Sequence, residues 1–243
     1  MKKVTIYILL FCCMLSFMPC HAEGPAESVE QAREQLQRLN IINEDSFSQE
    51  EIVYRCEAIV PIMKMIGLPE DVAKKGGPAF ISPPFVDITM DEWNNEDSPK
   101  NQYGITVDYY NYVIIGYLMW IVWGYRGNFS PYDAITAKEA ATFMMRAIED
   151  LLVLGSLDTE ITYTNAKACG LIQPEDRFYE DGDLALTRDE LCILLDRMLY
   201  QPCCICYRQT EIDPGPWYDE ARTKRYIDIL NGDFPESGDQ SLW

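Results

Sequence analysis

The chain has 243 residues, 48% hydrophobic and 24% charged, so it can bury a sizeable core and is too apolar for wholesale disorder. Its 39 acidic residues outnumber its 20 basic ones, and the net charge of −19 excludes the basic surface that nucleic-acid-binding proteins need. The one histidine, His21, lies in the leader described next. The rest of the chain therefore has no Ser-His-Asp or Cys-His catalytic group and no histidine ligand for zinc.

The first 22 residues have the features of a secretory signal peptide. Lys2 and Lys3 precede an uncharged apolar run, and Cys20-His21-Ala22 places small residues around a cleavage site. We expect an exported mature chain that begins at Glu23. Removal of Lys2 and Lys3 with the leader would change the net charge from −19 to −21. The alternative is an uncleaved N-terminal anchor.

Six of the nine cysteines lie beyond the leader: Cys56, Cys169, Cys192, Cys203, Cys204 and Cys206. Outside the cell, an even number permits disulfides, and the sequence does not choose among the pairings. One C-x-x-C at 203–206 lacks the second pair of a metal site and the βαβ context of a redox site. Disulfides or free thiols are therefore expected, with no metal and no cofactor.

A first helix is predicted by apolar residues that share one helix face: Val29, Ala32, Leu36 and Leu39. Residues 48–51 then have the form of a capping box, in which Ser48 caps the backbone three residues on and Glu51 reaches back. We expect a second helix to begin after Ser48 and to end at Gly67-Leu68-Pro69.

Residues 68–107 are rich in glycine, proline and acidic side chains, and they predict a surface insertion with an acidic tip at 91–97. The spacing of these acids does not fit a calcium-binding EF-hand loop. The next 17 residues, Tyr109 to Tyr125, carry no charge, which is the lower limit for a membrane span. Their tyrosines and the nearby Gly124 and Gly127 favour a buried helix over a second anchor.

Two more capping boxes, Thr136 with Glu139 and Thr187 with Glu190, predict two further helices. A shorter helix is expected between them, over 157–171, and a last one over 217–230. Because alternating β-branched runs are almost absent, we predict an all-α fold.

The first capping box lies 88 residues before the second, and the second lies 51 residues before the third. The two spacings become similar once the insertion at 68–107 is subtracted from the first. Such a period indicates stacked repeats that share one core. The first core residues of the three capped helices should all turn inward: Ile52, Phe143 and Ile193.

Motifs recur in order along these units: Phe85-Val86-Asp87, Gly170-Leu171-Ile172, Thr187-Arg188-Asp189-Glu190 and Trp217-Tyr218-Asp219. In this order they resemble the S-layer homology (SLH) domain over most of residues 26–235. The resemblance implies three helical repeats packed as a pseudo-threefold bundle with long irregular loops. The expected units are 1–22 (signal peptide), 23–67 (first repeat, front truncated), 68–107 (acidic insertion), 108–155 (second repeat), 156–201 (third repeat) and 202–243 (Cys-rich linker and partial fourth repeat).

SLH domains hold exported proteins at the cell wall by binding an anionic, often pyruvylated, secondary cell-wall polysaccharide. Their motif arginine faces a groove between units and pairs with a carboxylate of the ligand. Among the aligned positions only Arg188 is an arginine; the others are Gln49 and Ala137, and Lys138 lies about 100° further round its helix. The resemblance thus implies Arg188 and Trp217 as ligand-binding residues.

These features predict a secreted, cell-surface protein that binds wall polysaccharide or another surface protein. No catalytic residue, nucleic-acid partner or membrane span after cleavage is expected. The alternative is an extracytoplasmic carbohydrate-active enzyme that uses paired carboxylates. A pocket that contains two inward-facing acids with raised pKa would favour the enzyme, and an arginine-lined groove between helices would favour the binding protein.

Overall fold

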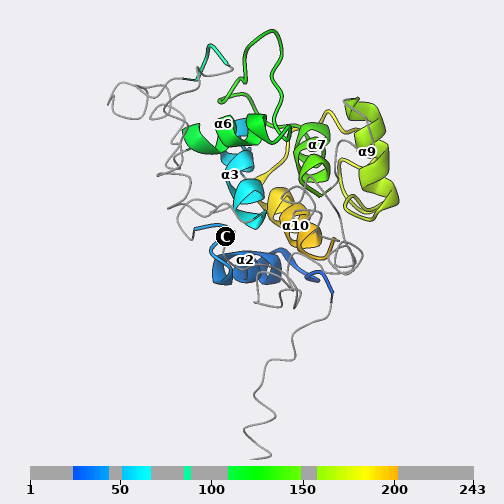
Figure 1. The fold of residues 1–243 in the computed structure, drawn as a ribbon. Helices are drawn as coiled ribbons and strands as arrows, with labels where there is room; N and C mark the ends of the chain where they lie inside the picture. Colours follow the sequence, from blue (N-terminus) through cyan, green and yellow to red (C-terminus); the bar gives the residue numbers. More distant parts are fainter. Residues whose placement is uncertain (1–23, 44–50, 67–84, 89–108, 149–157, 202–243) are drawn as a thin grey trace, which may run out of the picture.

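The computed structural model describes residues 24–43, 51–66, 85–88, 109–148 and 158–201. Every regular element in these ranges is a helix, which confirms the predicted all-α class for this part of the chain (Figure 1). The predicted leader, the predicted helix over 217–230 and Trp217 lie outside the described residues. The helices are α2 (Val29–Arg38), α3 (Arg55–Met65), α6 (Tyr110–Leu118), α7 (Ala137–Ile148), α9 (Thr159–Ala168) and α10 (Arg188–Leu199).

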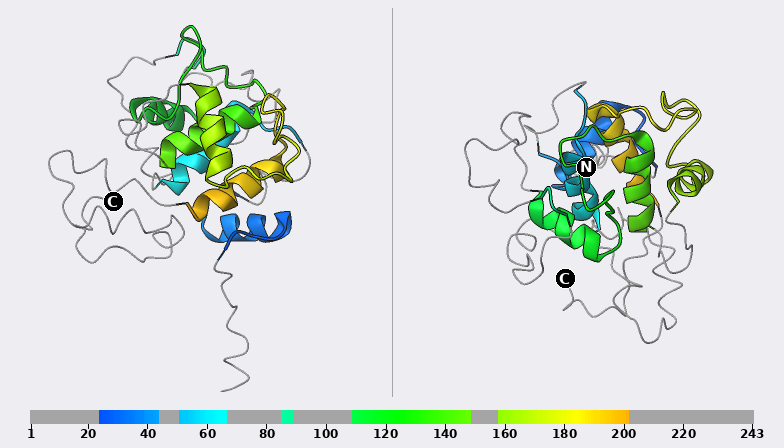
Figure 2. Two further views of the ribbon diagram at one scale, coloured as in Figure 1. Left: turned by 90° about the vertical axis from the view of Figure 1, so that its right-hand side faces the viewer. Right: turned by 90° about the horizontal axis from the view of Figure 1, so that it is seen from above.

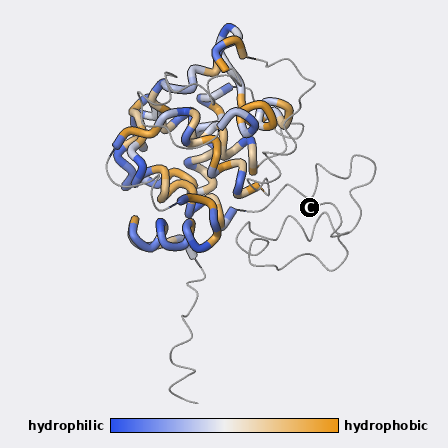
Figure 3. Tube along the Cα trace, turned by 90° about the vertical axis from the view of Figure 1, so that its left-hand side faces the viewer, coloured by the Kyte–Doolittle hydropathy of each residue, from blue (hydrophilic) through white to orange (hydrophobic). Residues whose placement is uncertain are grey.

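Three central helices, α3, α7 and α10, contact one another, and the other three pack around them. The outer helix α2 lies on α10, α6 lies on α3, and α9 lies on α7 (Figures 1 and 2). Each outer helix therefore packs mainly on a central helix other than the one that follows it in the chain. Hydrophobic residues gather toward the middle of this arrangement, whereas α2 is mostly hydrophilic (Figure 3).

Three short extended segments, 51–54, 133–136 and 184–187, meet at the centre of the bundle. The N–H of Val53 donates to the carbonyl of Leu186 at 3.0 Å, the N–H of Leu186 donates to that of Ile135 at 3.0 Å, and the N–H of Ile135 donates to that of Val53 at 2.9 Å. These three hydrogen bonds close a ring. All three side chains are fully buried, so the ring is also the apolar centre of the core.

The first residue of each central helix is tied to a different extended segment. Its N–H donates to a carbonyl in that segment, two residues before the segment's own member of the hydrogen-bond ring. These bonds are Arg55 to Asp133, Ala137 to Leu184 and Arg188 to Glu51, each at 3.0 Å. The starts of the three central helices are thereby fixed relative to one another.

The capping boxes predicted for α7 and α10 are confirmed. The Thr187 hydroxyl accepts from the N–H of Glu190 at 3.3 Å, and the Glu190 carboxylate accepts from the N–H of Thr187 at 2.9 Å. Thr136 and Glu139 make the same pair of bonds at 3.2 and 3.0 Å. These bonds satisfy backbone donors that a helix start otherwise leaves open.

The predicted start of the second helix at Ser48 is wrong. The helix begins after Tyr54, and the Glu57 carboxylate accepts from the N–H of Tyr54 at 3.1 Å. Ser48 itself lies outside the described residues, and Ile52 lies in the extended segment, 50% exposed, rather than turned toward the core. The long-range hydrogen bonds of the central ring hold this segment extended, where the local sequence pattern favours a helix.

The turns after the outer helices share one geometry. Asn40, Trp120 and Gly170 follow α2, α6 and α9 with φ values of 55°, 64° and 79°, the left-handed region in which many helices end. Two buried aliphatic residues come next in each case: Ile41-Ile42, Ile121-Val122 and Leu171-Ile172. The helix predicted over Tyr109 to Tyr125 is therefore too long, because α6 ends at Leu118.

The range 68–107, expected to be a surface insertion, is described only at 85–88, where Phe85 and Ile88 are buried in the core. The Asp87 carboxylate accepts from the N–H groups of Phe129 and Ser130 at 2.8 and 2.7 Å, so this motif holds the segment that leads into α7. Phe143 is buried as predicted, whereas Ile193 is only partly buried. Across the described ranges, no helix is both long enough and apolar enough to cross a membrane.

Candidate functional site

Arg188, the predicted ligand-binding arginine, lies at the start of α10 and contacts two carboxylates. Its Nη2 donates to Glu57 Oε1 at 2.8 Å, and its Nη1 donates to Glu51 Oε2 at 3.1 Å. The side chains of Arg188 and Glu57 are 11% and 7% exposed. Arg188 therefore forms an ion pair between α10 and α3. Trp217, the other predicted binding residue, lies outside the described residues.

A second arginine takes the same place on α3. Because α3 begins after Tyr54, the residue that corresponds to Arg188 is Arg55 rather than Gln49. The likeness of 54–57 (Tyr-Arg-Cys-Glu) to 187–190 (Thr-Arg-Asp-Glu) is the signal that could have found it. The sequence alignment missed Arg55 because it placed the first capping box at Ser48.

Arg55 is held by contacts to the segment before α7 and to α7 itself. Its Nε donates to the carbonyl of Phe129 at 2.8 Å, and its Nη1 bonds to the Glu139 carboxylate. The guanidinium also lies 5.0 Å from the ring centre of Phe129 and 5.4 Å from that of Phe143. Cation–π contacts of this kind stabilise a guanidinium that is largely withdrawn from water.

Each glutamate in the first turn of a central helix pairs with an arginine. Glu57 pairs with Arg188, and Glu139 pairs with Arg55. At Glu190 the partner is Arg177, which comes from the loop before α10 and bonds to both carboxylate oxygens, at 2.8 and 3.0 Å. The first residue of α7 is Ala137, which has no charge, where α3 and α10 have an arginine. Arg177 therefore supplies the cation for Glu190.

The electrostatics of these glutamates differ. Burial raises the pKa of Glu57, and this effect outweighs its hydrogen bond from Tyr54 and its pairing with Arg188. Burial alone would also raise the pKa of Glu190, but hydrogen bonds from Arg177 and Thr187 outweigh it, and the pKa is lowered. Loss of Arg188 would therefore leave the Glu57 carboxylate buried without its ion-pair partner.

A cavity of about 580 Å³ opens beside Arg55, between α3, α7 and the residues that precede α7; we call it the Arg55 cavity. Two buried cations line it, Arg55 and Arg146, which are 8% and 6% exposed. Burial lowers the pKa of Arg146 to about 10, so this guanidinium still carries its charge at neutral pH. Trp123 and Tyr125 form an aromatic part of the wall.

Four hydroxyl-bearing residues also line the Arg55 cavity: Ser130, Thr136, Thr142 and Thr159. The Thr136 hydroxyl takes part in the cap of α7, and the Thr142 hydroxyl donates to the carbonyl of Lys138 at 2.7 Å. A cavity of this size with a few convergent polar groups is typical of small-ligand sites. Positive charge, aromatic faces and hydroxyl groups together suit a sugar that carries an acidic substituent.

Two carboxylates, Asp133 and Glu139, also line the Arg55 cavity. One oxygen of Glu139 bonds to Arg55, and the other accepts from the N–H of Thr136 at 3.0 Å. Glu139 is therefore engaged at both oxygens, in a cap and in an ion pair. This arrangement suits a structural carboxylate better than a general acid, which must present a proton to a substrate.

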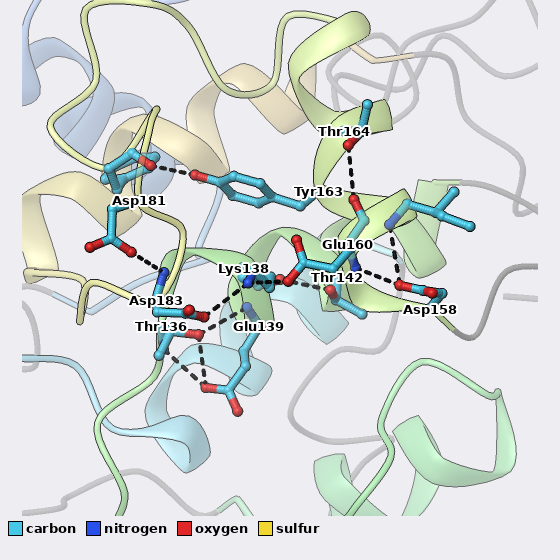
Figure 4. Close-up of polar contacts among 12 residues, drawn as sticks. Thr136, Lys138, Glu139, Thr142, Asp158, Glu160, Tyr163, Thr164, Asp181 and Asp183 are labelled. Atoms are coloured by element: carbon cyan, nitrogen blue, oxygen red, sulfur yellow. Dashed lines mark hydrogen bonds and ion pairs between the residues drawn. The ribbon is translucent and has the colours of Figure 1, made fainter.

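Lys138, which follows Ala137 on α7, contacts α9 and the loop before α10 (Figure 4). Its Nζ donates to Glu160 at 2.5 Å and lies 3.0 Å from Asp183. The hydrogen bond to Glu160 and then that to Asp183 raise the pKa of Lys138. The side chain thus fastens α9 onto α7.

Lys138→Met should lower the free energy of unfolding by about 0.5–1 kcal/mol at low salt, because both acidic partners are exposed and such pairs are weak. The loss should shrink at high salt, where the charges are screened. Urea unfolding of both proteins at two salt concentrations measures this difference. A loss that does not change with salt would contradict an electrostatic role for Lys138.

Comparison with known proteins assigns no family to this chain. No family model, no curated protein and no solved structure matches it. In the part of the chain that the structure describes, no three His, Cys, Asp or Glu side chains form a group that could hold a metal ion. The arginines, aromatic rings and hydroxyl groups of the Arg55 cavity are the chemistry from which a function can be argued.

Proposed function

We propose that the protein is an exported, SLH-like module that binds an anionic cell-wall polysaccharide, with the Arg55 cavity as its binding site. The observation that carries this proposal is the presence of Arg55, Arg146 and Trp123 in the wall of one cavity. A guanidinium matches the geometry of a carboxylate such as that of a pyruvylated sugar. An indole provides a flat apolar face for the ring of the sugar.

The packing of the helices supports three repeats with a pseudo-threefold relation, as in the fold that the SLH resemblance implies. The units are α2 with α3, α6 with α7, and α9 with α10. The outer helix of each unit packs on the central helix of the preceding unit, and α2 of the first unit packs on α10 of the last. The closed hydrogen-bond ring relates the three units in the same cyclic order.

The binding site that we propose differs from the one expected from sequence. Arg188 is paired with Glu57 and Glu51, whereas the cavity beside Arg55 brings in a second cation, Arg146. The net charge of the chain opposes the approach of an anionic polymer. We therefore expect modest affinity that depends on a few well-placed cations. The engagement of both Glu139 oxygens favours binding over the alternative of carbohydrate hydrolysis.

Co-sedimentation with purified Gram-positive cell walls tests this function. The mature chain, residues 23–243, should bind intact walls and lose binding to walls stripped of their secondary polysaccharide by mild acid. Arg146→Gln should weaken binding about tenfold, since it removes a charge-assisted contact. Arg146→Lys keeps the charge but loses the planar fork, and it should bind at an intermediate level.

Lys167→Gln is the matched control, because it removes a cation from α9 that does not line the cavity. It should bind walls as well as the unchanged protein does. Circular dichroism should show that all variants keep their helix content. Equal binding to intact and stripped walls, or equal binding by Arg146→Gln and Lys167→Gln, would contradict the proposal.

A further inference from the structure

We propose that Trp120, together with Trp123 of the cavity wall, forms a second subsite that extends beyond the Arg55 cavity and stacks an uncharged pyranose ring of the same polysaccharide. We call this pair the Trp120 platform. The inference rests on the proposed function, because it says how the polymer continues beyond the cavity. Its starting point is a residue that the stability of the fold does not explain.

Trp120 has a backbone conformation that is unfavourable for a large side chain. Its φ of 64° lies in the left-handed region, where asparagine and glycine are preferred and bulky residues are rare. The corresponding turns after α2 and α9 have those two residues, Asn40 and Gly170. Burial does not compensate for the conformation, because Trp120 is 58% exposed. Conformations of this kind tend to occur at functional sites.

The Trp120 ring has a defined neighbour. The ring centres of Trp120 and Trp123 are 5.5 Å apart, and the Trp123 indole N–H donates to the carbonyl of Trp120 at 3.2 Å. Trp123 also lines the Arg55 cavity, and the Arg146 guanidinium lies 6.0 Å from the centre of its ring. Arg146, Trp123 and Trp120 thus form a continuous row from the buried cation to the surface.

The chemistry beside the Trp120 platform favours a sugar ring. A pyranose presents C–H groups on one face, which suit an indole, and hydroxyl groups around its rim, which suit the hydroxyl-lined cavity. The negative net charge of the chain opposes contact with anionic lipid headgroups. Cations at one end of the row and an uncharged aromatic face at the other fit a polymer in which an acidic sugar is followed by a neutral one.

Trp120→Gly tests the platform, because glycine suits the observed φ and removes the aromatic face. The probe is the polysaccharide released from cell walls by mild acid, titrated calorimetrically into the mature chain. We expect affinity to fall about tenfold, while the thermal unfolding midpoint stays the same or rises by a few degrees. A purely structural tryptophan would give the reverse: a lower midpoint and unchanged affinity. Leu118→Ala, which removes an exposed apolar side chain from the end of α6, is the matched control.

The outcomes separate this inference from the proposed function. If the unchanged protein bound no polysaccharide, the proposed function would fail and the platform with it. If Arg146→Gln weakened binding and Trp120→Gly did not, only the platform would be overturned. An equal loss in Leu118→Ala would also overturn it, because that result indicates a general apolar contact. So would binding to neutral phosphatidylcholine vesicles that depends on Trp120.

Discussion

Arg188→Ala is expected to lower the free energy of unfolding by about 3 kcal/mol at neutral pH. The change leaves the Glu57 carboxylate buried without its ion pair, and breaking a buried pair on one side is strongly destabilising. Thr187 and Glu190 still cap the start of α10 in this variant, but the destabilised group is on α3. Urea unfolding of both proteins measures the loss.

The pH dependence of this loss identifies its cause. The pKa of Glu57 is already raised in the folded protein, and without Arg188 it should rise further. The folded variant then holds a proton that the unfolded chain releases, so its stability should increase as the pH falls from about 7 toward about 5. Arg188→Ala combined with Glu57→Gln should recover part of the loss at neutral pH.

Arg177→Ala is the control for Arg188→Ala, since Arg177 also pairs with a first-turn glutamate but its side chain is half exposed. It should lose only about 0.5–1 kcal/mol. If Arg188→Ala lost no more than Arg177→Ala, or if its loss did not change with pH, the buried ion pair would not be the source of the stability.

Phe129→Ala should lower the free energy of unfolding by about 3–5 kcal/mol, the range for removing a fully buried aromatic ring. The ring centre lies 5.7 Å from that of Phe85 and 6.5 Å from that of Phe143, and the Arg55 guanidinium lies over it. The substitution leaves a cavity where three parts of the chain meet. Thermal and urea unfolding should both detect the change.

Phe129→Leu retains much of the buried volume and should lose less than Phe129→Ala. Val86→Ala, at an exposed neighbour of Phe85, should change stability little. A loss in Phe129→Ala that is no larger than in Val86→Ala would contradict the central packing role of the ring.

The capping-box motifs predicted the helices whose first residues are fixed by hydrogen bonds within the same turn. Thr136 with Glu139, and Thr187 with Glu190, specify the starts of α7 and α10 through hydrogen bonds within a single turn. Ser48 offered the same signal, but its neighbouring segment 51–54 takes its conformation from the segments 133–136 and 184–187. A sequence pattern that spans one helical turn gives no signal for pairing between segments that lie far apart in the chain.

The candidate site was predictable only in part for the same reason. The third capping box is aligned correctly and places Arg188 at the start of α10, but Arg188 does not line the Arg55 cavity. Arg55 was missed because the first box was aligned at Ser48. Arg146 and Trp123 lie apart in sequence and stand in no recognised motif, and only the packing of α7 against the preceding segment brings them to one cavity. The end of α6 at Trp120 was missed because tryptophan gives no signal for a left-handed turn.

The contact between α2 and α10 has a consequence for the time course of folding. These helices come from opposite ends of the described chain, so the apolar face of α10 receives its cover from residues that were synthesised first. Contacts at such long separation in sequence slow folding, because the loop entropy is lost before the contacts form. A chain synthesised from its N-terminus cannot complete this core until Leu199 has left the ribosome. The apolar face of α10 and its cover on α2 would therefore come together only after the last described helix has been made.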